Sequence, residues 1–282
     1  MQHLSGFAPL AERYDGFVID LWGVVHDGVT PYEGAVACLE RLDALGKPAV
    51  LLSNAPRRAA VAQKGMRAMG IPDALYAGIL TSGEVTHIML RDRTDPWFAA
   101  LGRRMFHLGP ERDRNIFAGL DLEPVAHPAA ADFVLNTGPD DQRSPTDIGE
   151  YEPTLRDCAA ARLPMVCANP DLEVIRGGVA VICAGALARR YEALGGKVRW
   201  IGKPDPAVYG PVLKMLGLPA GRVLALGDAL RTDIAGAAAA GIDACWVLGG
   251  IHHAWREDPE QAEAEARAAG LSPVACIPAF VW

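Results

Sequence analysis

The segment Phe17-Val18-Ile19-Asp20-Leu21-Trp22-Gly23-Val24 decides the fold of this chain. Its first three residues form a short apolar run, which is typical of a buried strand. Asp20 follows directly, at the point where such a strand would end. An acidic residue after a strand is often only a turn former. Its meaning therefore depends on what the neighbouring strands carry at their own ends.

The same order of an apolar run and a helical pattern recurs near both ends of the chain. Helices are predicted over residues 31–45, 57–69, 206–216 and 233–240, and further strands over 48–52, 223–226 and 244–248. Short β-branched strands that alternate with helices indicate a parallel sheet covered on both faces. The predicted fold class is therefore α/β, with a doubly wound parallel sheet.

The middle of the chain has a more varied pattern. It contains its own strand candidates, over residues 104–108, 133–136 and 165–168. We expect this region to form a separate α/β unit inserted into the first. The predicted division is a core domain of residues 1–83 and 182–282 and an inserted domain of residues 84–181.

Composition excludes several classes of protein. A net charge of −7 gives no basic face for nucleic acid. No apolar stretch reaches the ~20 residues needed to cross a bilayer, and the first nine residues lack the pattern of a signal peptide. The six cysteines form no CxxC pair, which favours buried free thiols over disulfides or zinc. The sequence therefore predicts a soluble, cytoplasmic protein without nucleic-acid or membrane partners.

Polar residues stand where several of the predicted strands end. Ser53 and Asn54 follow the second strand, and Asp228 follows the strand over 223–226, with Asp233 five residues further on. The carboxyl ends of parallel strands meet at one edge of a sheet, where ligands bind. We therefore expect these side chains to converge with Asp20.

This set suits the hydrolysis of a phosphate ester. A carboxylate such as Asp20 can attack phosphorus and form an aspartyl-phosphate. The anionic phosphate repels it, so a cation such as Mg²⁺ is needed, with oxygen ligands from Asp20, Asp228 and Asp233. Lys203 would offset the carboxylates, and the Ser53 hydroxyl would hold the phosphoryl oxygens.

Four segments resemble, in order, the motifs of the haloacid dehalogenase superfamily. They are Asp-Leu-Trp-Gly-Val at 20–24, Leu-Ser-Asn at 52–54, Gly-Lys-Pro at 202–204 and Gly-Asp-Ala-Leu-Arg-Thr-Asp-Ile at 227–234. Ala-Asn-Pro-Asp at 168–171 and Gly-Ala-Leu at 185–187 are similar to its NagD-like branch, subclass IIA. That branch contains sugar and nucleotide phosphatases with an α/β cap inserted after the second motif.

The resemblance implies a role for each matching catalytic and metal-binding residue. Asp20 matches the nucleophile, Ser53 the phosphate-binding hydroxyl and Lys203 the lysine of the third motif. Asp228 and Asp233 match the acidic pair that holds Mg²⁺, directly or through water. The implied enzyme is a Mg²⁺-dependent phosphoric monoester hydrolase.

The resemblance also implies where the substrate binds. Asn54 would lie near the phosphate or the substrate, and the cap would supply Asn169 and Asp171. Arg143, in the polar loop 138–144, could pair with a second anionic group, although this loop is more simply an exposed one. The implied substrate is a small sugar phosphate or nucleotide monophosphate, and a homodimer through the cap is implied as well.

Trp22 departs from the family pattern. The family phosphatases usually carry there an aspartate that protonates the leaving oxygen and then activates water, and an indole cannot transfer a proton. The family residue also binds Mg²⁺ through its backbone carbonyl, which Trp22 retains. His26 or Asp27 could substitute as acid and base, although a surface histidine and a tight turn are the simpler reading. Alternatively, a substrate with a good leaving group could need little acid.

Two further functions stay open. The chain could be a catalytically impaired relative that binds a phosphoester or a partner protein. It could instead be a dehalogenase, because dehalogenases of this superfamily carry an aromatic residue at this position and need no Mg²⁺. Asp228 and Asp233 argue against that second function, since they would repel an anionic haloacid. The pair His252-His253 is more simply a plain loop than part of the site.

Overall fold

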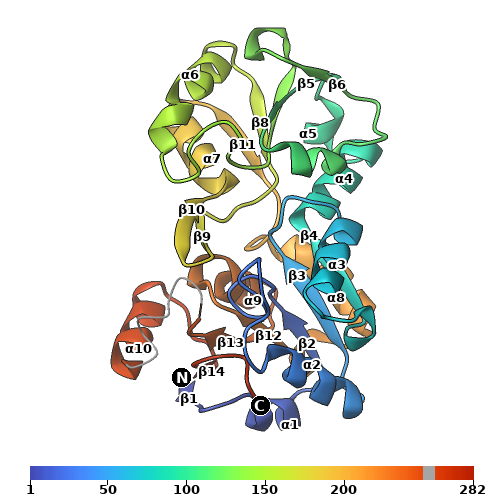
Figure 1. The fold of residues 1–282 in the computed structure, drawn as a ribbon, viewed down its shortest axis with the longest axis vertical. Coiled ribbons are helices and arrows are strands. Elements are labelled where there is room, and N and C mark those ends of the chain that lie inside the picture. The colour runs from blue at the N-terminus through green and yellow to red at the C-terminus, as the bar shows by residue number, and fades with distance from the viewer. Residues whose placement is uncertain (250–257) are drawn as a thin grey trace.

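The computed structural model describes residues 1–249 and 258–282, so the pair His252-His253 lies outside the described residues. Two parallel sheets lie one above the other along the long axis of the molecule (Figure 1). The lower sheet contains both ends of the chain, and the upper sheet is formed by the middle of the chain. The predicted α/β fold class is confirmed.

The core sheet has seven strands in the order β1-β14-β13-β12-β2-β3-β4, and every neighbouring pair is parallel. In chain order, its strands are β1 (Gln2–His3), β2 (Gly16–Ile19), β3 (Ala49–Ser53), β4 (Gly78–Thr81), β12 (Val223–Gly227), β13 (Asp243–Val247) and β14 (Ala275–Ile277). The strands predicted from the sequence in this sheet differ from the observed ones by one residue at most.

Helices cover both faces of the core sheet. The helices of one face are α1 (Ala8–Arg13), α2 (Ala35–Ala44) and α3 (Ala59–Ala68), and those of the other are α8 (Tyr209–Leu216), α9 (Ala235–Ala239) and α10 (Pro259–Ala268). Successive strand residues point to opposite faces. Phe17 and Ile19 therefore pack in the first layer, whereas Val18 packs in the second. This double covering explains why β2 is apolar throughout.

The second sheet has five parallel strands in the order β11-β8-β7-β5-β6. They are β5 (Arg104–Leu108), β6 (Glu123–Val125), β7 (Phe133–Asn136), β8 (Pro164–Cys167) and β11 (Lys197–Trp200). Its layers contain α4 (Ser82–Asp92) and α5 (Pro96–Ala99) on one face and α6 (Glu152–Ala160) and α7 (Ala184–Ala193) on the other. A hairpin of β9 (Glu173–Arg176) and β10 (Val179–Ile182) lies between the two sheets in Figure 1.

The predicted end of the insert at residue 181 is too early. Both α7 and β11 lie beyond it, and β11 pairs with β8 from Lys197↔Pro164 to Trp200↔Cys167. The chain therefore returns to the core sheet only after Trp200. A helix followed by a short strand has the same sequence pattern in either sheet, so the pattern alone could not place this unit.

The described part of the chain has no helix that is long and apolar enough to cross a membrane. All six cysteines are free and buried, as expected.

At the centre of the core sheet, β2 and β12 are neighbours whose chains continue in opposite directions, to β3 and to β13. Such a switch point opens a crevice at the carboxyl ends of the strands, and this crevice contains the candidate site.

Candidate active site

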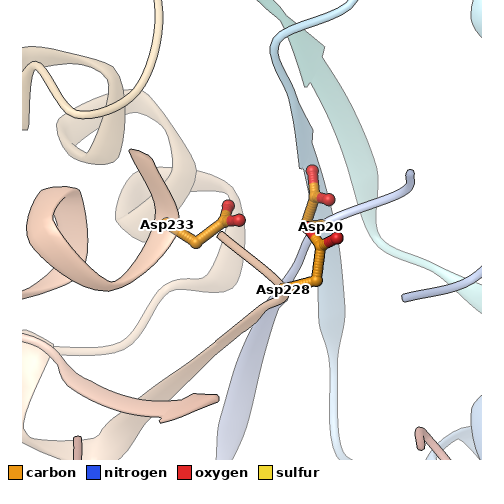
Figure 2. Close-up of side chains that lie close together, drawn as sticks. All are labelled: Asp20, Asp228 and Asp233. Carbon is orange, nitrogen blue, oxygen red and sulfur yellow. The ribbon is translucent and has the colours of Figure 1, made fainter. Parts of the chain in front are cut away.

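Three carboxylates gather at the switch point. Asp20 directly follows β2, and its backbone N–H donates to the Leu226 carbonyl of the neighbouring strand over 2.9 Å. Asp228 directly follows β12, and Asp233 lies in the π-helical turn Leu230–Ile234 that comes next. Figure 2 shows the Asp233 side chain pointing toward the other two. One oxygen of each of the three lies within 4.8 Å of the others, so the predicted convergence occurs.

Two glycines allow this close approach. A Cβ at Gly23 would lie 2.1 Å from Asp228 Oδ2, and the φ angle of +85° also favours glycine there. A Cβ at Gly227 would lie 2.1 Å from the Cβ of Asp233. The glycines of the first and fourth motifs are therefore needed to let carboxylates stand against the backbone.

Lys203 binds this cluster from the loop after β11. Its ammonium donates to Asp20 Oδ1 and Asp233 Oδ1 over 2.6 Å each, and to the Leu52 carbonyl over 2.9 Å. The residue is 3% exposed. Burial alone would lower the pKa of Lys203, but the charges of Asp20 and Asp233 raise it well above its usual value. Lys203 is therefore a permanent cation that fixes the Asp20 carboxylate.

One lysine does not neutralise the acidic cluster. Burial, opposed by the charge of Lys203 and assisted by that of Asp233, raises the pKa of Asp20 to about 8. Burial also raises the pKa of Asp228 well above its usual value, and the charge of Asp20 adds to the effect. Three buried carboxylates around one ammonium favour a further cation, and hard oxygen donors suit Mg²⁺. The donor set thus fits the implied metal.

Ser53 and Asn54 stand beside this cluster at the end of β3. Asn54 accepts from the Lys203 backbone N–H over 2.8 Å, and its amide donates to the Lys203 carbonyl over 3.2 Å and to Asp171 over 2.9 Å. Asn54 therefore joins the lysine loop to the insert. Ser53 Oγ accepts a longer bond of 3.2 Å from the Ala55 N–H.

Asn169 and Asp171 lie in the turn after β8. Asn169 accepts from the Asp171 backbone N–H over 2.9 Å, which shapes the turn. Burial raises the pKa of Asp171, although nearby Lys203 opposes this shift. The structure therefore brings both predicted substrate residues of the insert to the edge of the core sheet.

The core and the insert enclose a cavity of 520 Å³. Its walls include Asp20, Ser53 and Asn54 from the core and Asn169, Asp171 and Val181 from the insert. A second cavity of 250 Å³ adjoins the same edge, and Asp20, Asp171, Lys203, Asp228 and Asp233 all line it. Volumes of about 300–1,000 Å³ are usual for small-molecule sites. The larger cavity is suited to a small metabolite.

Trp22 points its indole at the insert. The indole N–H donates to the Ile175 carbonyl of β9 over 2.8 Å. A Cβ at Gly28 would lie 2.1 Å from the ring, so the turn packs closely against it. The side chain that replaces the usual aspartate thus forms a hydrogen bond between the nucleophile loop and the hairpin.

His26 and Asp27 do not line either cavity. Asp27 accepts from the backbone N–H groups of Val29 and Thr30, as a turn residue would. The expectation that His26 lies on the surface is wrong, since it is 7% exposed. Burial lowers its pKa to about 4, and its Nδ1 accepts from the Gly28 N–H. Neither side chain therefore reaches the cavities that Asp20 lines.

Arg143 lines the larger cavity but already has a partner. Its guanidinium donates twice to Asp140, over 2.9 and 2.5 Å, and lies 4.0 Å from the centre of the Tyr151 ring. The cavity also contains Arg57 and Asp113, which sequence reasoning missed. Arg57 lies four residues after Ser53, so its closeness in sequence to a predicted site residue could have indicated it. No motif or strand end marks Asp113.

Comparisons with known proteins agree with this geometry. A family model described as haloacid dehalogenase-like hydrolase matches residues 17–123, and one described as HAD-hydrolase-like matches residues 200–272. The solved structure of a haloacid dehalogenase-like hydrolase from Brucella suis is 35% identical, with a TM-score of 0.83, and the match covers 99% of this chain and 100% of that one.

Two curated relatives are more distant. D-glycerol 3-phosphate phosphatase from Mycobacterium tuberculosis is 28% identical over 87% of this chain, and the match spans 66% of that enzyme. Acid sugar phosphatase from Staphylococcus aureus is 25% identical, over 85% of this chain and 88% of that enzyme. Together with the matched motifs, these findings confirm that the chain is a hydrolase of the haloacid dehalogenase-like family, in its NagD-like branch.

Proposed function

We propose that the protein is a Mg²⁺-dependent phosphatase that hydrolyses a small phosphorylated metabolite, a sugar phosphate or a nucleotide monophosphate. The observation that carries this proposal is the position of Asp20, which is held by Lys203 over 2.6 Å and lines a 520 Å³ cavity. The names of the two curated relatives, a glycerol 3-phosphate phosphatase and an acid sugar phosphatase, support the sugar phosphate of these two classes.

Asp20, Asp228, Asp233 and the backbone carbonyl of Trp22 would hold the metal. When bound, Mg²⁺ neutralises the charge between the carboxylates and the phosphate. The donor cluster supports this assignment, because its three carboxylates converge within 4.8 Å with Lys203 as their one ammonium partner among the described residues.

Each residue of the site then has a separate role in catalysis. Asp20 attacks phosphorus, the bond to the leaving oxygen breaks, and water later hydrolyses the aspartyl-phosphate. Lys203 orients Asp20 and balances its charge. The Ser53 hydroxyl holds a phosphoryl oxygen, and Asn54, Asn169 and Asp171 contact the rest of the substrate. The insert acts as a cap that keeps bulk water from the intermediate.

The proton for the leaving oxygen needs a separate donor. Trp22 cannot supply it, and His26 and Asp27 do not line the cavity. We assign this role to Asp171, which lines both cavities together with Asp20. Its raised pKa favours the protonated acid that a leaving oxygen requires.

Release of phosphate from a panel of metabolites and p-nitrophenyl phosphate, with and without Mg²⁺, tests the proposal. We expect Mg²⁺-dependent release that Asp20→Asn abolishes. A matched control is Asp121→Asn, because Asp121 is exposed and lines neither cavity. No Mg²⁺-dependent release from any ester would reject the enzyme, and activity in Asp20→Asn would reject the nucleophile.

A second candidate function is a catalytically impaired relative that binds phosphoesters without turnover. The bond between the Trp22 indole and the Ile175 carbonyl favours it, because this side chain joins the hairpin and takes no part in proton transfer. Ester binding measured by calorimetry, without release of phosphate at any pH, would favour this second function over the first.

A further inference from the structure

One acid–base pair in the wall of the larger cavity lacks hydrogen bonds. Asp113 belongs to the 3-10 helix η2 (Glu111–Ile116), is 2% exposed and lines the cavity together with Arg57. Within residues 1–249 and 258–282, Asp113 Oδ1 and Arg57 Nε are buried without a hydrogen-bond partner. The distance from Arg57 Nη2 to Asp113 Oδ1 is 3.8 Å, which is beyond hydrogen-bond range.

The backbone on each side holds this gap open. The Thr81 hydroxyl donates to the Arg57 carbonyl over 2.6 Å, which fixes the loop after β3 to the core. The next residue, Arg58, donates its backbone N–H to Asn115 Oδ1 over 2.7 Å, which fixes the same loop to η2. Arg57 and Asp113 are therefore placed by independent contacts and do not depend on one another for their positions.

Leaving the two charges in this state is unfavourable. Burial raises the pKa of Asp113 to about 6, against the opposing charge of Arg57. Burial also lowers the pKa of Arg57, against the opposing charge of Asp113. Buried polar atoms without partners are rare in folded proteins, and each one destabilises the fold. Both residues line the cavity, and the Arg57 side chain is 31% exposed, so a ligand group that bonded to both side chains would relieve part of this.

We propose that Arg57 and Asp113 form a subsite that binds a hydroxyl group of the substrate. This inference rests on the proposed function, because the subsite shares its cavity with Asp20 and Ser53. A hydroxyl accepts from the guanidinium and donates to the carboxylate at the same time. An ammonium group would be repelled by Arg57 and by Arg112 and Arg176, which line the same cavity. The subsite therefore suits a phosphate ester with a free hydroxyl group, such as a phosphorylated polyol or sugar.

The chemistry of the subsite predicts discrimination between esters that differ in their hydroxyl groups. A site that hydrogen-bonds a substrate hydroxyl rejects an analogue that lacks it, because its own buried groups are then unpaired. Arg57 and Asp113 would thus determine specificity, whereas Asp20, Ser53 and Lys203 act on the phosphate that all esters share.

The test measures binding in the Asp20→Asn protein with Mg²⁺, so that no ester is consumed. Calorimetry gives the Kd of matched pairs, such as glycerol 3-phosphate with propyl phosphate and sorbitol 6-phosphate with hexyl phosphate. We expect at least one polyol ester to bind about 10-fold or more tightly than its partner. Adding Asp113→Asn or Arg57→Lys should reduce that ratio to about 3-fold or less.

Glu111→Gln is the matched control, because Glu111 lies on the same 3-10 helix, is exposed and does not line the cavity. It should leave the ratio unchanged. An equal Kd within every pair, or a ratio that survives both subsite variants, would overturn the inference.

Failure of the proposed function has a separate readout. Turnover of p-nitrophenyl phosphate, which carries no hydroxyl group, by the unmutated protein with Mg²⁺ reports on Asp20 and the metal site. The Kd ratios report on the hydroxyl subsite whether or not that turnover occurs. The two ideas can therefore fail independently of one another.

Discussion

Two acid–cation pairs line this molecule's cavities: a closed, buried pair in which Lys203 contacts its acids, and an open pair in which a gap separates Asp113 from Arg57, whose side chain is 31% exposed. Lys203 touches Asp20 and Asp233 over 2.6 Å each, whereas Arg57 stands 3.8 Å from Asp113. The ammonium of Lys203 has three oxygen partners. The Arg57 Nε and the Asp113 Oδ1 have none among the described residues.

The difference indicates which polar groups are paired within the protein and which are left to bind a ligand. Lys203 follows β11, and its acids follow β2 and β12. These three side chains orient one another before any substrate arrives. Arg57 and Asp113 come from the core and from the insert, each held by other contacts. A preorganised centre serves the step common to all substrates, whereas an open pair can discriminate between them.

The largest predicted effect comes from removing the cation of the closed pair, Lys203. Lys203→Met should lower kcat for p-nitrophenyl phosphate by about 10³-fold, because the nucleophile loses its orienting cation. It should also lower the free energy of unfolding by about 3–5 kcal/mol, because removal of the lysine leaves buried carboxylates without a cation. Urea unfolding and steady-state kinetics measure the two effects.

Arg57→Met is the control for that prediction, because it removes a cation from the open pair instead. It should destabilise the protein clearly less, since the lost partner made no hydrogen bond through Nε. Equal destabilisation by the two variants would mean that the two pairs do not differ energetically.

The second prediction concerns proton transfer at the centre formed by Asp20 and Lys203. Trp22→Asp restores the carboxyl group that the family usually has, and general acid–base help is worth about 10²–10⁴-fold. Because the proposed mechanism already assigns proton donation to Asp171, we expect kcat for an alkyl phosphate to stay nearly unchanged with Mg²⁺ present. Trp22→Asn, of the same size but unable to transfer a proton, should behave in the same way. A rise of about 10²-fold in Trp22→Asp alone would mean that the acid–base role is vacant and that Asp171 does not fill it.

The third prediction concerns the pH dependence of the open pair. The pKa of Asp113 is raised to about 6 in the folded protein, against an ordinary value of about 3.9. The folded state therefore binds the proton more tightly than the unfolded state. Its contribution to stability is full below about pH 4 and is lost as the pH rises through about 6.

Asp113→Asn removes this titration, so the stability of the unmutated protein relative to the variant should fall between pH 4 and pH 7. The expected change is about 1–3 kcal/mol in the free energy of unfolding, since each pKa unit corresponds to about 1.4 kcal/mol. Urea unfolding at both pH values, with Glu111→Gln as the control, measures it. A pH-independent difference would show that the pair is not strained by burial.

The smallest predicted effect concerns the bond between the two parts of the molecule. Trp22→Phe keeps the ring but loses the hydrogen bond to the Ile175 carbonyl, which is worth about 0.5–1.5 kcal/mol. Amide hydrogen exchange should quicken in the hairpin β9–β10 and stay unchanged in β2 and β12. Unchanged exchange in the hairpin would mean that other contacts alone hold it.

Much of the site could be predicted because its residues directly follow strands. Asp20, Ser53 and Asp228 each stand where an apolar run ends, and parallel strands bring such positions together whatever the details of packing. The burial of His26 was missed, since a short polar loop gives no sign of which of its members turns inward. Residues 197–200, which form the final strand of the second sheet, were placed in the core domain for a similar reason.

The sequence by itself determined the parallel α/β sheets, the acidic cluster and the lysine that binds it, because periodicity and short motifs are local. Only the tertiary structure decided that β11 joins the second sheet, that the Trp22 indole bonds to the hairpin and that Arg57 faces Asp113 across a gap. These contacts join residues more than thirty positions apart along the chain. Such pairings depend on how whole layers pack, and no local pattern encodes that packing.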